Sequence, residues 1–274
     1  MDEREALHVA ARRYCMEHHE RWVQRYSESA FDSAHPEAQD IFPRYQVLAA
    51  ILADVESVVP KDFVTLEDVR GFLLVAGQGA EDMFTRPPKS PLADQAIGEE
   101  RAAFCRFIQR ITPEDLAVVV PLPYRRTLSR EEHQVLWTRL YERWGVREGQ
   151  YWYPLSPEAA PPDALAFQQD WFDHAVPPPV LQHILATHGV ARVWELHEYG
   201  PEYEITLAQV EPEYGDTEGY WTAGEIDWVI YVSHESSVTV GGSWLTVAVQ
   251  AVWPEWDQHL YTGWDYRPPP RDGR

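Results

Sequence analysis

The chain has 274 residues, of which 45% are hydrophobic and 13% aromatic, and its formal net charge is -21. This hydrophobic content is too high for a disordered chain, so a folded protein must carry the charge. A strongly negative protein repels nucleic-acid phosphates and anionic membrane surfaces, so we expect neither as a partner.

The two cysteines, Cys15 and Cys105, lie in separate helix-like segments and are too few for the usual thiolate zinc site. Residues 1–25 are charged throughout and lack the apolar stretch of a secretory signal. No apolar run is long enough to span a bilayer. We therefore expect a reduced, soluble, cytoplasmic protein without a disulfide, a bound metal or a cofactor.

The N-terminal part is predicted to be helical. Apolar residues recur at three- and four-residue spacing in residues 3–26 and 38–58, which is typical of amphipathic helices. Thr65 with Asp68 three positions later resembles a capping box, and Ser90 before a proline is a second helix start. Thr112 before a proline repeats that start signal for a short segment.

Helix signals continue after a proline-rich junction at residues 116–123. Ser129 and Glu132 form a capping box at the start of a helix that should end at Gly145. A further helix is expected from Pro178 to His188, because Gly189 follows it.

The period of hydrophobic residues then changes from helical to alternating. Residues 192–198 with 203–210, and 228–233 with 237–240, are predicted to form two β-hairpins. Residues 211–225 are rich in glycine and acidic residues, so we interpret them as a mobile loop. A last helix should follow Gly241-Gly242.

These elements predict an α+β fold, with a helical N-terminal part followed by a C-terminal antiparallel sheet flanked by helices. The expected domains are a helical domain of residues 1–125 and an acidic, tryptophan-rich α+β domain of residues 126–266. Residues 267–274 are expected to be a disordered tail.

Acidic and aromatic residues concentrate in the C-terminal part. Residues 148–266 contain nineteen Asp and Glu, one basic residue (Arg192) and nine of the twelve tryptophans. A surface of one charge sign attracts the opposite sign, and Trp and Tyr often anchor interfaces. We expect the functional surface in residues 126–266, with residues 1–125 mainly supporting it. The candidate partner-binding residues are Glu213, Asp216, Glu218, Tyr220, Trp221, Glu225, Asp227 and Trp228.

The acidic, tryptophan-rich composition is also consistent with roles other than partner binding. Large aromatic residues are usually buried, so most of these tryptophans would then belong to the core. Adaptation to a salty host also enriches acidic residues and depletes lysine. Acidic residues at phosphate-like spacing would instead mimic DNA.

Three groups of residues have a catalytic or metal-binding pattern. The string from Ser233 to Ser236 places a hydroxyl, His234 and Glu235 close in sequence, although a catalytic triad must converge in space and a polar turn explains the string equally well. Glu195 and His197 share a strand face, and Glu204 and Thr206 of the paired strand are expected opposite them.

The third group lies on the first helix, where Glu5 and His8 have the Glu-x-x-His spacing of carboxylate-bridged metal sites. Cys15 and His18 are also three residues apart. No second such motif occurs, so we interpret Cys15 and His18 as core residues.

We therefore hypothesise an acidic protein-binding module, of the inhibitor or immunity type, that neutralises a basic protein partner. Its composition is similar to that of acidic bacterial proteins that neutralise toxins, although no motif supports the likeness. The alternative is a hydrolase or metal-dependent enzyme that uses His197, His234 and nearby carboxylates.

Overall fold

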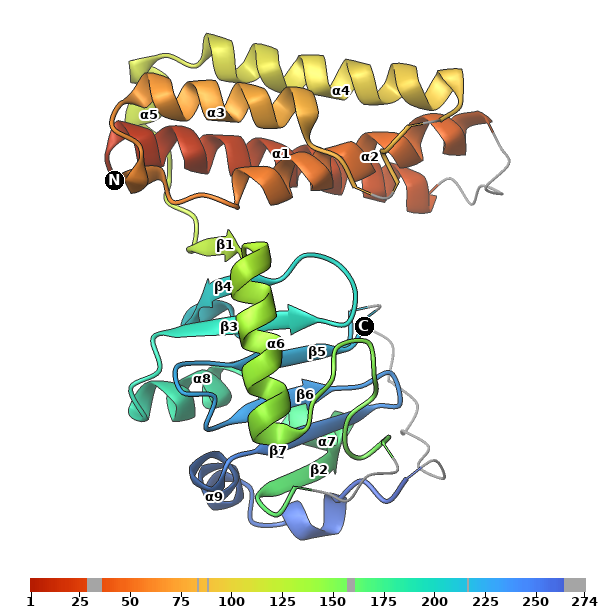
Figure 1. Ribbon diagram of the computed structural model, residues 1–274, viewed down its shortest axis with the longest axis vertical. Helices are drawn as coiled ribbons and strands as arrows, with labels where there is room; N and C mark the ends of the chain where they lie inside the picture. Colours follow the sequence, from red (N-terminus) through yellow and green to blue (C-terminus); the bar gives the residue numbers. More distant parts are fainter. Residues whose placement is uncertain (29–35, 83, 88, 157–160, 216, 264–274) are drawn as a thin grey trace. The chain divides into compact units, whose positions relative to one another are not determined.

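The computed structural model describes residues 1–28, 36–82, 84–87, 89–156, 161–215 and 217–263. Contacts within the chain divide it into two compact units, Met1–Leu122 and Pro123–Arg274 (Figure 1). The first unit ends at Leu122 instead of residue 125, because residues from Arg125 onward pair with the C-terminal sheet. The expected tail, residues 267–274, lies outside the described residues.

The N-terminal unit is helical. Its helices are α1 (Glu3–Glu28), α2 (Pro36–Val55), α3 (Leu66–Gly79), α4 (Pro91–Arg110) and the short α5 (Pro113–Ala117), with a 3₁₀ turn at Pro60–Asp62.

The predicted helix starts are confirmed by their caps. The Thr65 side chain accepts a hydrogen bond from the Asp68 N–H, and the Asp68 carboxylate accepts one from the Thr65 N–H. Thr112 and Asp115 form the same capping box before α5. Ser90 caps α4 by accepting from the Ala93 N–H. Each cap satisfies backbone donors that a helix start leaves unpaired.

The core of this unit joins α1 to α4. A Cβ atom added at Gly77 on α3 would lie 2.5 Å from the Phe104 ring of α4, so the glycine lets the two helices approach closely. A buried ion pair crosses the same core, with Arg12 Nε 2.8 Å from Glu56 Oε1.

The C-terminal unit is built on a seven-stranded sheet with the order β1-β4-β3-β5-β6-β7-β2, in which every neighbouring pair is antiparallel. The strands are β1 (Arg125–Thr127), β2 (Ala164–Gln168), β3 (Arg192–His197), β4 (Tyr203–Thr206), β5 (Gly219–Thr222), β6 (Val229–Val232) and β7 (Ser237–Gly241).

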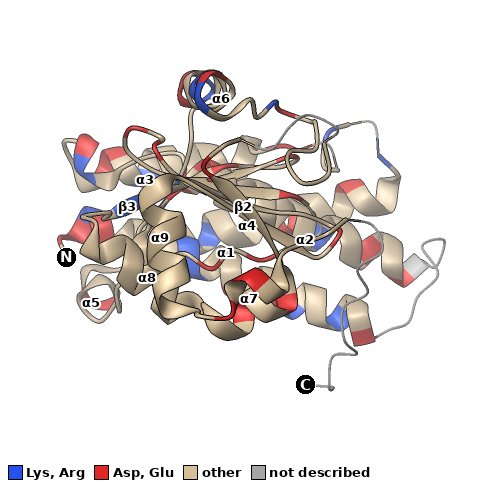
Figure 2. Cartoon of the chain, turned by 90° about the horizontal axis from the view of Figure 1, so that it is seen from below, with Lys and Arg blue, Asp and Glu red and all other residues tan. Residues whose placement is uncertain are grey.

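Helices cover both faces of this sheet (Figures 1 and 2). One face packs against α6 (Arg130–Trp144), which starts at the Ser129 capping box and ends at Gly145, whose φ is 70°. The other face packs against α7, α8 and α9. Their bounds are Gln169–Ala175, Pro178–Thr187 and Ser243–Val252. The predicted α+β class is therefore confirmed.

The sequence-based prediction of residues 211–225 as a mobile loop is wrong, since Gly219–Thr222 form β5 in the middle of the sheet. Residues 203–210 form a strand only to Thr206 and then a 3₁₀ turn, Leu207–Gln209. Strand β2 and helix α7 were not predicted. These elements are short, and β5 and β2 lack a polar face because helices cover both sides of the sheet.

No helix among the described residues has the length and apolar content that crossing a membrane requires.

Candidate functional site

The structure buries the aromatic residues expected at the partner surface. Tyr220 and Trp221 of β5 and the neighbouring Trp228 are at most 2% exposed. Trp221 and Trp228 pack in the core beneath α7, α8 and α9, whereas Tyr220 packs beneath α6. These three residues therefore cannot contact a partner at the surface. The two tryptophans are core residues, as the alternative interpretation of the sequence expected.

Their burial follows from the position of β5. This strand pairs with β3 on one side and with β6 on the other, so it has no free edge. Successive side chains of a strand point to opposite faces, and here both faces are covered by helices. An aromatic residue at any position of β5 is therefore in a core.

The predicted acidic contacts divide into buried and exposed groups. Glu218 is only 2% exposed, so it is also removed from the expected surface. Glu213, Glu225 and Asp227 are exposed. Glu225 lies 3.6 Å from Arg139 and Asp227 accepts a hydrogen bond from Trp244. Asp216 lies outside the described residues.

Histidines and carboxylates gather at one end of the sheet. The register places His197 at the end of β3 beside Gly219 at the start of β5. Gly219 in turn pairs with Val232 at the end of β6. The connections at this end carry Glu198, Glu202, Glu218, His234 and Glu235. We call these five residues, together with His197, the polar sheet end.

A buried hydrogen-bond network centres on Glu218. Its carboxylate accepts a hydrogen bond from the Tyr231 hydroxyl, and its Oε1 lies 2.5 Å from His234 Nδ1. His234 Nε2 lies 3.3 Å from Glu235 Oε1. Burial and the neighbouring Tyr220 and Glu218 raise the pKa of Tyr231 far above its ordinary value, so Tyr231 remains a hydrogen-bond donor. The arrangement fixes the orientation of a half-exposed imidazole.

A second buried carboxylate, Glu202, holds another histidine. Glu202 Oε2 lies 2.7 Å from His133 Nδ1, and Glu202 Oε1 accepts a hydrogen bond of 2.6 Å from the Trp137 indole. His133 Nε2 lies 3.3 Å from the exposed Glu148. His133 and Trp137 belong to α6, so this network ties α6 to the start of β4. Both buried carboxylates therefore stabilise the fold on the α6 side.

The expected cross-strand cluster around Glu195 and His197 is only partly formed. His197 Nε2 lies 3.6 Å from Glu195 Oε1, and its Nδ1 lies 2.9 Å from the Pro201 carbonyl oxygen. Burial opposes protonation of His197, but these two partners outweigh burial and raise its pKa.

Glu204 does not join this cluster. The register pairs Glu204 with Trp194 and pairs Glu195 with Tyr203, so Glu204 lies on the opposite face. It accepts a hydrogen bond from the Tyr124 hydroxyl there. The expectation that Glu204 and Thr206 lie opposite Glu195 and His197 is wrong.

The Ser-His-Glu-Ser string does not form a triad. Ser233 is buried and its Oγ lies 2.7 Å from Ser237 Oγ. The carboxylate that orients His234 is Glu218, which is sixteen residues earlier in the sequence. Among the described residues no serine hydroxyl is hydrogen-bonded to His234.

The first-helix group is mainly structural. His8 is buried and its Nε2 lies 2.8 Å from the Val55 carbonyl oxygen. Burial lowers its pKa to about 4. Cys15 is buried and Glu5 pairs with Lys61. Among the described residues, no group of three His, Cys, Asp or Glu side chains has a geometry that would hold a metal ion.

Sequence reasoning missed three exposed tyrosines. Tyr199 and Tyr151 adjoin the polar sheet end, and Tyr214 lies on the connection that leads to Glu218. Tyr199 is 70% exposed, Tyr151 is 51% exposed and Tyr214 is 41% exposed. The Tyr151 ring lies 5.1 Å from the His234 ring. The Glu198 carboxylate, with a smaller effect from Tyr151, raises the pKa of Tyr199. The available signal was their position in turn-forming segments, where an aromatic residue has no strand or helix to pack into.

Comparisons of this chain with models of protein families, with curated proteins and with solved structures find no match.

Proposed function

We propose that the chain is a protein-binding module, of the inhibitor or immunity type, that captures a basic protein through the polar sheet end and its three tyrosines. The observation that carries this proposal is the presence of two exposed tyrosines, Tyr199 and Tyr214, in an acidic segment without Lys or Arg, together with the exposed Tyr151 against His234. Residues 197–227 contain nine Asp and Glu and no Lys or Arg.

The tyrosines are suited to anchor an interface. Tyrosine provides a large contact area with few rotatable bonds, and its hydroxyl group forms hydrogen bonds. The turn that carries Tyr199 is held in place, because its N–H donates to Thr217 Oγ1 at 3.2 Å and the Glu198 N–H donates to the Glu218 carbonyl at 3.0 Å. A preorganised contact loses less conformational entropy on binding.

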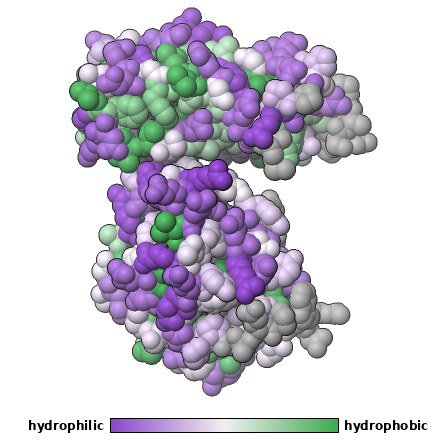
Figure 3. All heavy atoms as spheres, viewed as in Figure 1, coloured by the Kyte–Doolittle hydropathy of each residue, from purple (hydrophilic) through white to green (hydrophobic). Residues whose placement is uncertain are grey.

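The exposed carboxylates around them supply the opposite charge for a basic partner. Glu211 and Glu213 are exposed on the same connection as Tyr214, and Glu148 is exposed near Tyr151. The surrounding face over α6 is largely hydrophilic (Figure 3). Such a charge distribution accelerates association with a cationic protein, whereas desolvated aromatic residues slow dissociation.

The test is affinity capture with the full chain and a matched pair of tyrosine variants. We expect the wild-type chain to retain a basic protein that Tyr199→Ala loses. Tyr141→Ala is the control, because Tyr141 is 50% exposed on α6 and outside the proposed surface. Equal retention by both variants would contradict the proposed site, and capture of only neutral or acidic proteins would contradict the proposed partner.

A second candidate function, hydrolysis with His234 as general base, is favoured by the Glu218–His234 contact. A carboxylate on Nδ1 orients an imidazole so that Nε2 can take a proton, and here Glu235 Oε1, 3.3 Å from Nε2, competes for that position. The measurement is the hydrolysis of a chromogenic ester by the wild-type chain and by His234→Gln. Turnover that survives in His234→Gln, or none in the wild-type chain, would exclude this candidate.

A further inference from the structure

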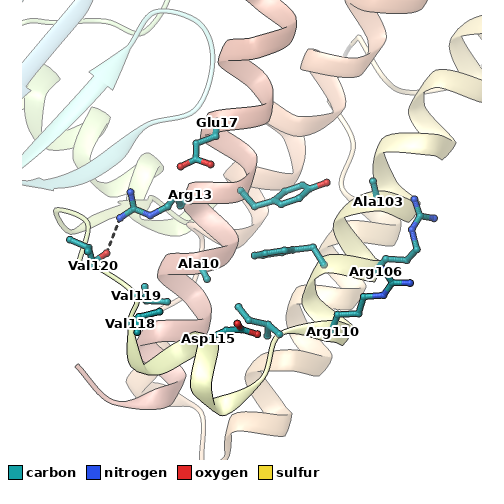
Figure 4. Close-up of a pocket in the computed structure, with 13 residues that line it drawn as sticks. Ala10, Arg13, Glu17, Ala103, Arg106, Arg110, Asp115, Val118, Val119 and Val120 are labelled. Carbon is teal, nitrogen blue, oxygen red and sulfur yellow. Dashed lines mark hydrogen bonds between the residues drawn. The ribbon is translucent and has the colours of Figure 1, made fainter.

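The helical unit contains a pocket of about 800 Å³ that the proposed function does not use. It lies between α1, α4, α5 and residues 118–120 (Figure 4). All the residues that line it belong to Met1–Leu122. Its volume is within the range of small-molecule sites in proteins.

The interior of the pocket is apolar. The Tyr14 and Phe107 rings stack with their centroids 4.6 Å apart and line one side. Ala10 of α1 and Ala103 of α4 leave room because their side chains are small. Val118, which is 78% exposed, lies in the wall opposite α4. An exposed apolar surface of this kind favours an apolar ligand.

The rim of the pocket is cationic. Arg106 and Arg110 lie one helical turn apart on α4 and extend side by side in Figure 4. In the part of the chain that the structure describes, neither has a hydrogen bond or an ion pair. A third arginine, Arg13, donates to the Val120 carbonyl oxygen at 2.8 Å.

The acidic residues at the pocket do not cancel this rim. Glu17 lies on α1, whereas the two unpaired arginines lie on α4. The Asp115 carboxylate is engaged by the N–H and the hydroxyl group of Thr112, at 2.9 and 3.0 Å. The lining thus has three arginines and two acidic residues, although the whole chain has 23 basic and 44 acidic residues. The local charge is opposite in sign to that of the chain.

We propose that this pocket binds a ligand with a single alkyl chain and an anionic head group. The alkyl chain of the ligand would lie against Tyr14 and Phe107, and its head group between Arg106 and Arg110. Guanidinium groups recognise carboxylate and phosphate oxygens in bidentate geometry. At 0.15 M salt the Debye length is about 8 Å, so distant acidic residues are screened while contacts at the rim are not.

The test is calorimetric titration of the full chain at 0.15 M salt with four ten-carbon probes, each below its micelle concentration. The probes are decanoate, decyl phosphate, decanol and decyltrimethylammonium. We expect an anion to bind at least tenfold more tightly than decanol and the cation to bind least. Tighter decanoate binding would assign a fatty carboxylate, and tighter decyl phosphate binding a phosphorylated lipid.

Two variants distinguish the contribution of the ligand's head group to binding from that of its alkyl chain. Arg106→Gln/Arg110→Gln should weaken anion binding at least tenfold and leave decanol binding unchanged. Its matched control is Lys61→Gln/Arg86→Gln, which removes the same charge from exposed positions of the same unit that do not line the pocket. Ala103→Phe should fill the pocket and abolish binding of every probe.

The proposal is overturned if no anion binds, or if both charge variants bind decanoate equally. It is also overturned if the wild-type chain sediments as a dimer that Ala103→Phe dissociates, because a second copy of the chain would then occupy the pocket.

Discussion

Replacing Trp221 by alanine should destabilise the C-terminal unit and leave its surface intact. Trp221 is 2% exposed, and a buried aromatic side chain of this size removes about 200 Å² from water. At about 25 cal/mol per Å² this burial contributes about 5 kcal/mol. Because the surroundings relax only partly, we expect Trp221→Ala to lower the free energy of unfolding by about 3–5 kcal/mol.

A substitution at Gly219 should have an effect on stability that depends on the residue at position 221. A Cβ atom added at Gly219 would lie 2.4 Å from the edge of the Trp221 ring. Gly219→Ala should therefore cost about 1–3 kcal/mol through overpacking in the wild-type chain. In the Trp221→Ala background the space is open, so the same change should cost much less, which is a non-additive effect.

The measurement is amide hydrogen exchange of β6 residues at increasing urea concentration, because β6 pairs with β5 and reports on the C-terminal unit alone. Trp221→Phe keeps an aromatic ring and removes the indole N–H, which has no hydrogen-bond partner among the described residues. It should cost less than Trp221→Ala. A loss below about 1 kcal/mol for Trp221→Ala, or additive effects of the two changes, would refute a core role for Trp221.

Three further predictions concern buried charges and histidines. Arg12→Met removes one member of the buried pair with Glu56 and should cost about 3–5 kcal/mol in urea unfolding, whereas Arg12→Met/Glu56→Leu should recover most of the loss. His8 has a pKa lowered from 6.5 to about 4 by burial, so the unfolded state binds the extra proton first as pH falls. Stability should therefore fall by up to about 3 kcal/mol from pH 6.5 to 4, and His8→Gln should flatten this dependence. His197 has a raised pKa, so its contribution to stability should be complete below the unfolded value of about 6.5 and disappear as pH rises through the folded value. An NMR titration that places the His197 pKa below that of an unfolded peptide would contradict this last prediction.

Local signals explain which parts of the fold could be predicted. The caps at Thr65, Ser90 and Ser129 involve residues at most three positions apart, so the sequence contains both partners. Strand β5 has no such signal: it is four residues long, buried on both faces and preceded by the acidic Glu218. Polar and apolar residues do not alternate along β5, so the acidic residues around it favour the interpretation of this segment as a solvated loop.

The candidate site depends on contacts that sequence spacing does not contain. Glu218 meets His234 only because the sheet pairs Gly219 with Val232. A one-residue change of register would turn Glu218 to the other face. The sequence pattern predicts a carboxylate partner for His234, but it points to the adjacent Glu235, because a sequence shows only which residues are neighbours along the chain.

The net charge of the chain overstates the charge available to a partner. Glu56, Glu100, Glu202 and Glu218 are all buried. Each has a donor within the fold: Arg12, Arg44, the His133–Trp137 pair and Tyr231, respectively. A buried carboxylate without such a donor would be costly, so these acidic residues serve folding first. Only the exposed carboxylates can therefore serve adaptation to a salty host or attract a basic partner. Tyr199 is an exposed aromatic residue in an acidic segment without Lys or Arg, and for this reason the proposed partner site lies there and not on β5.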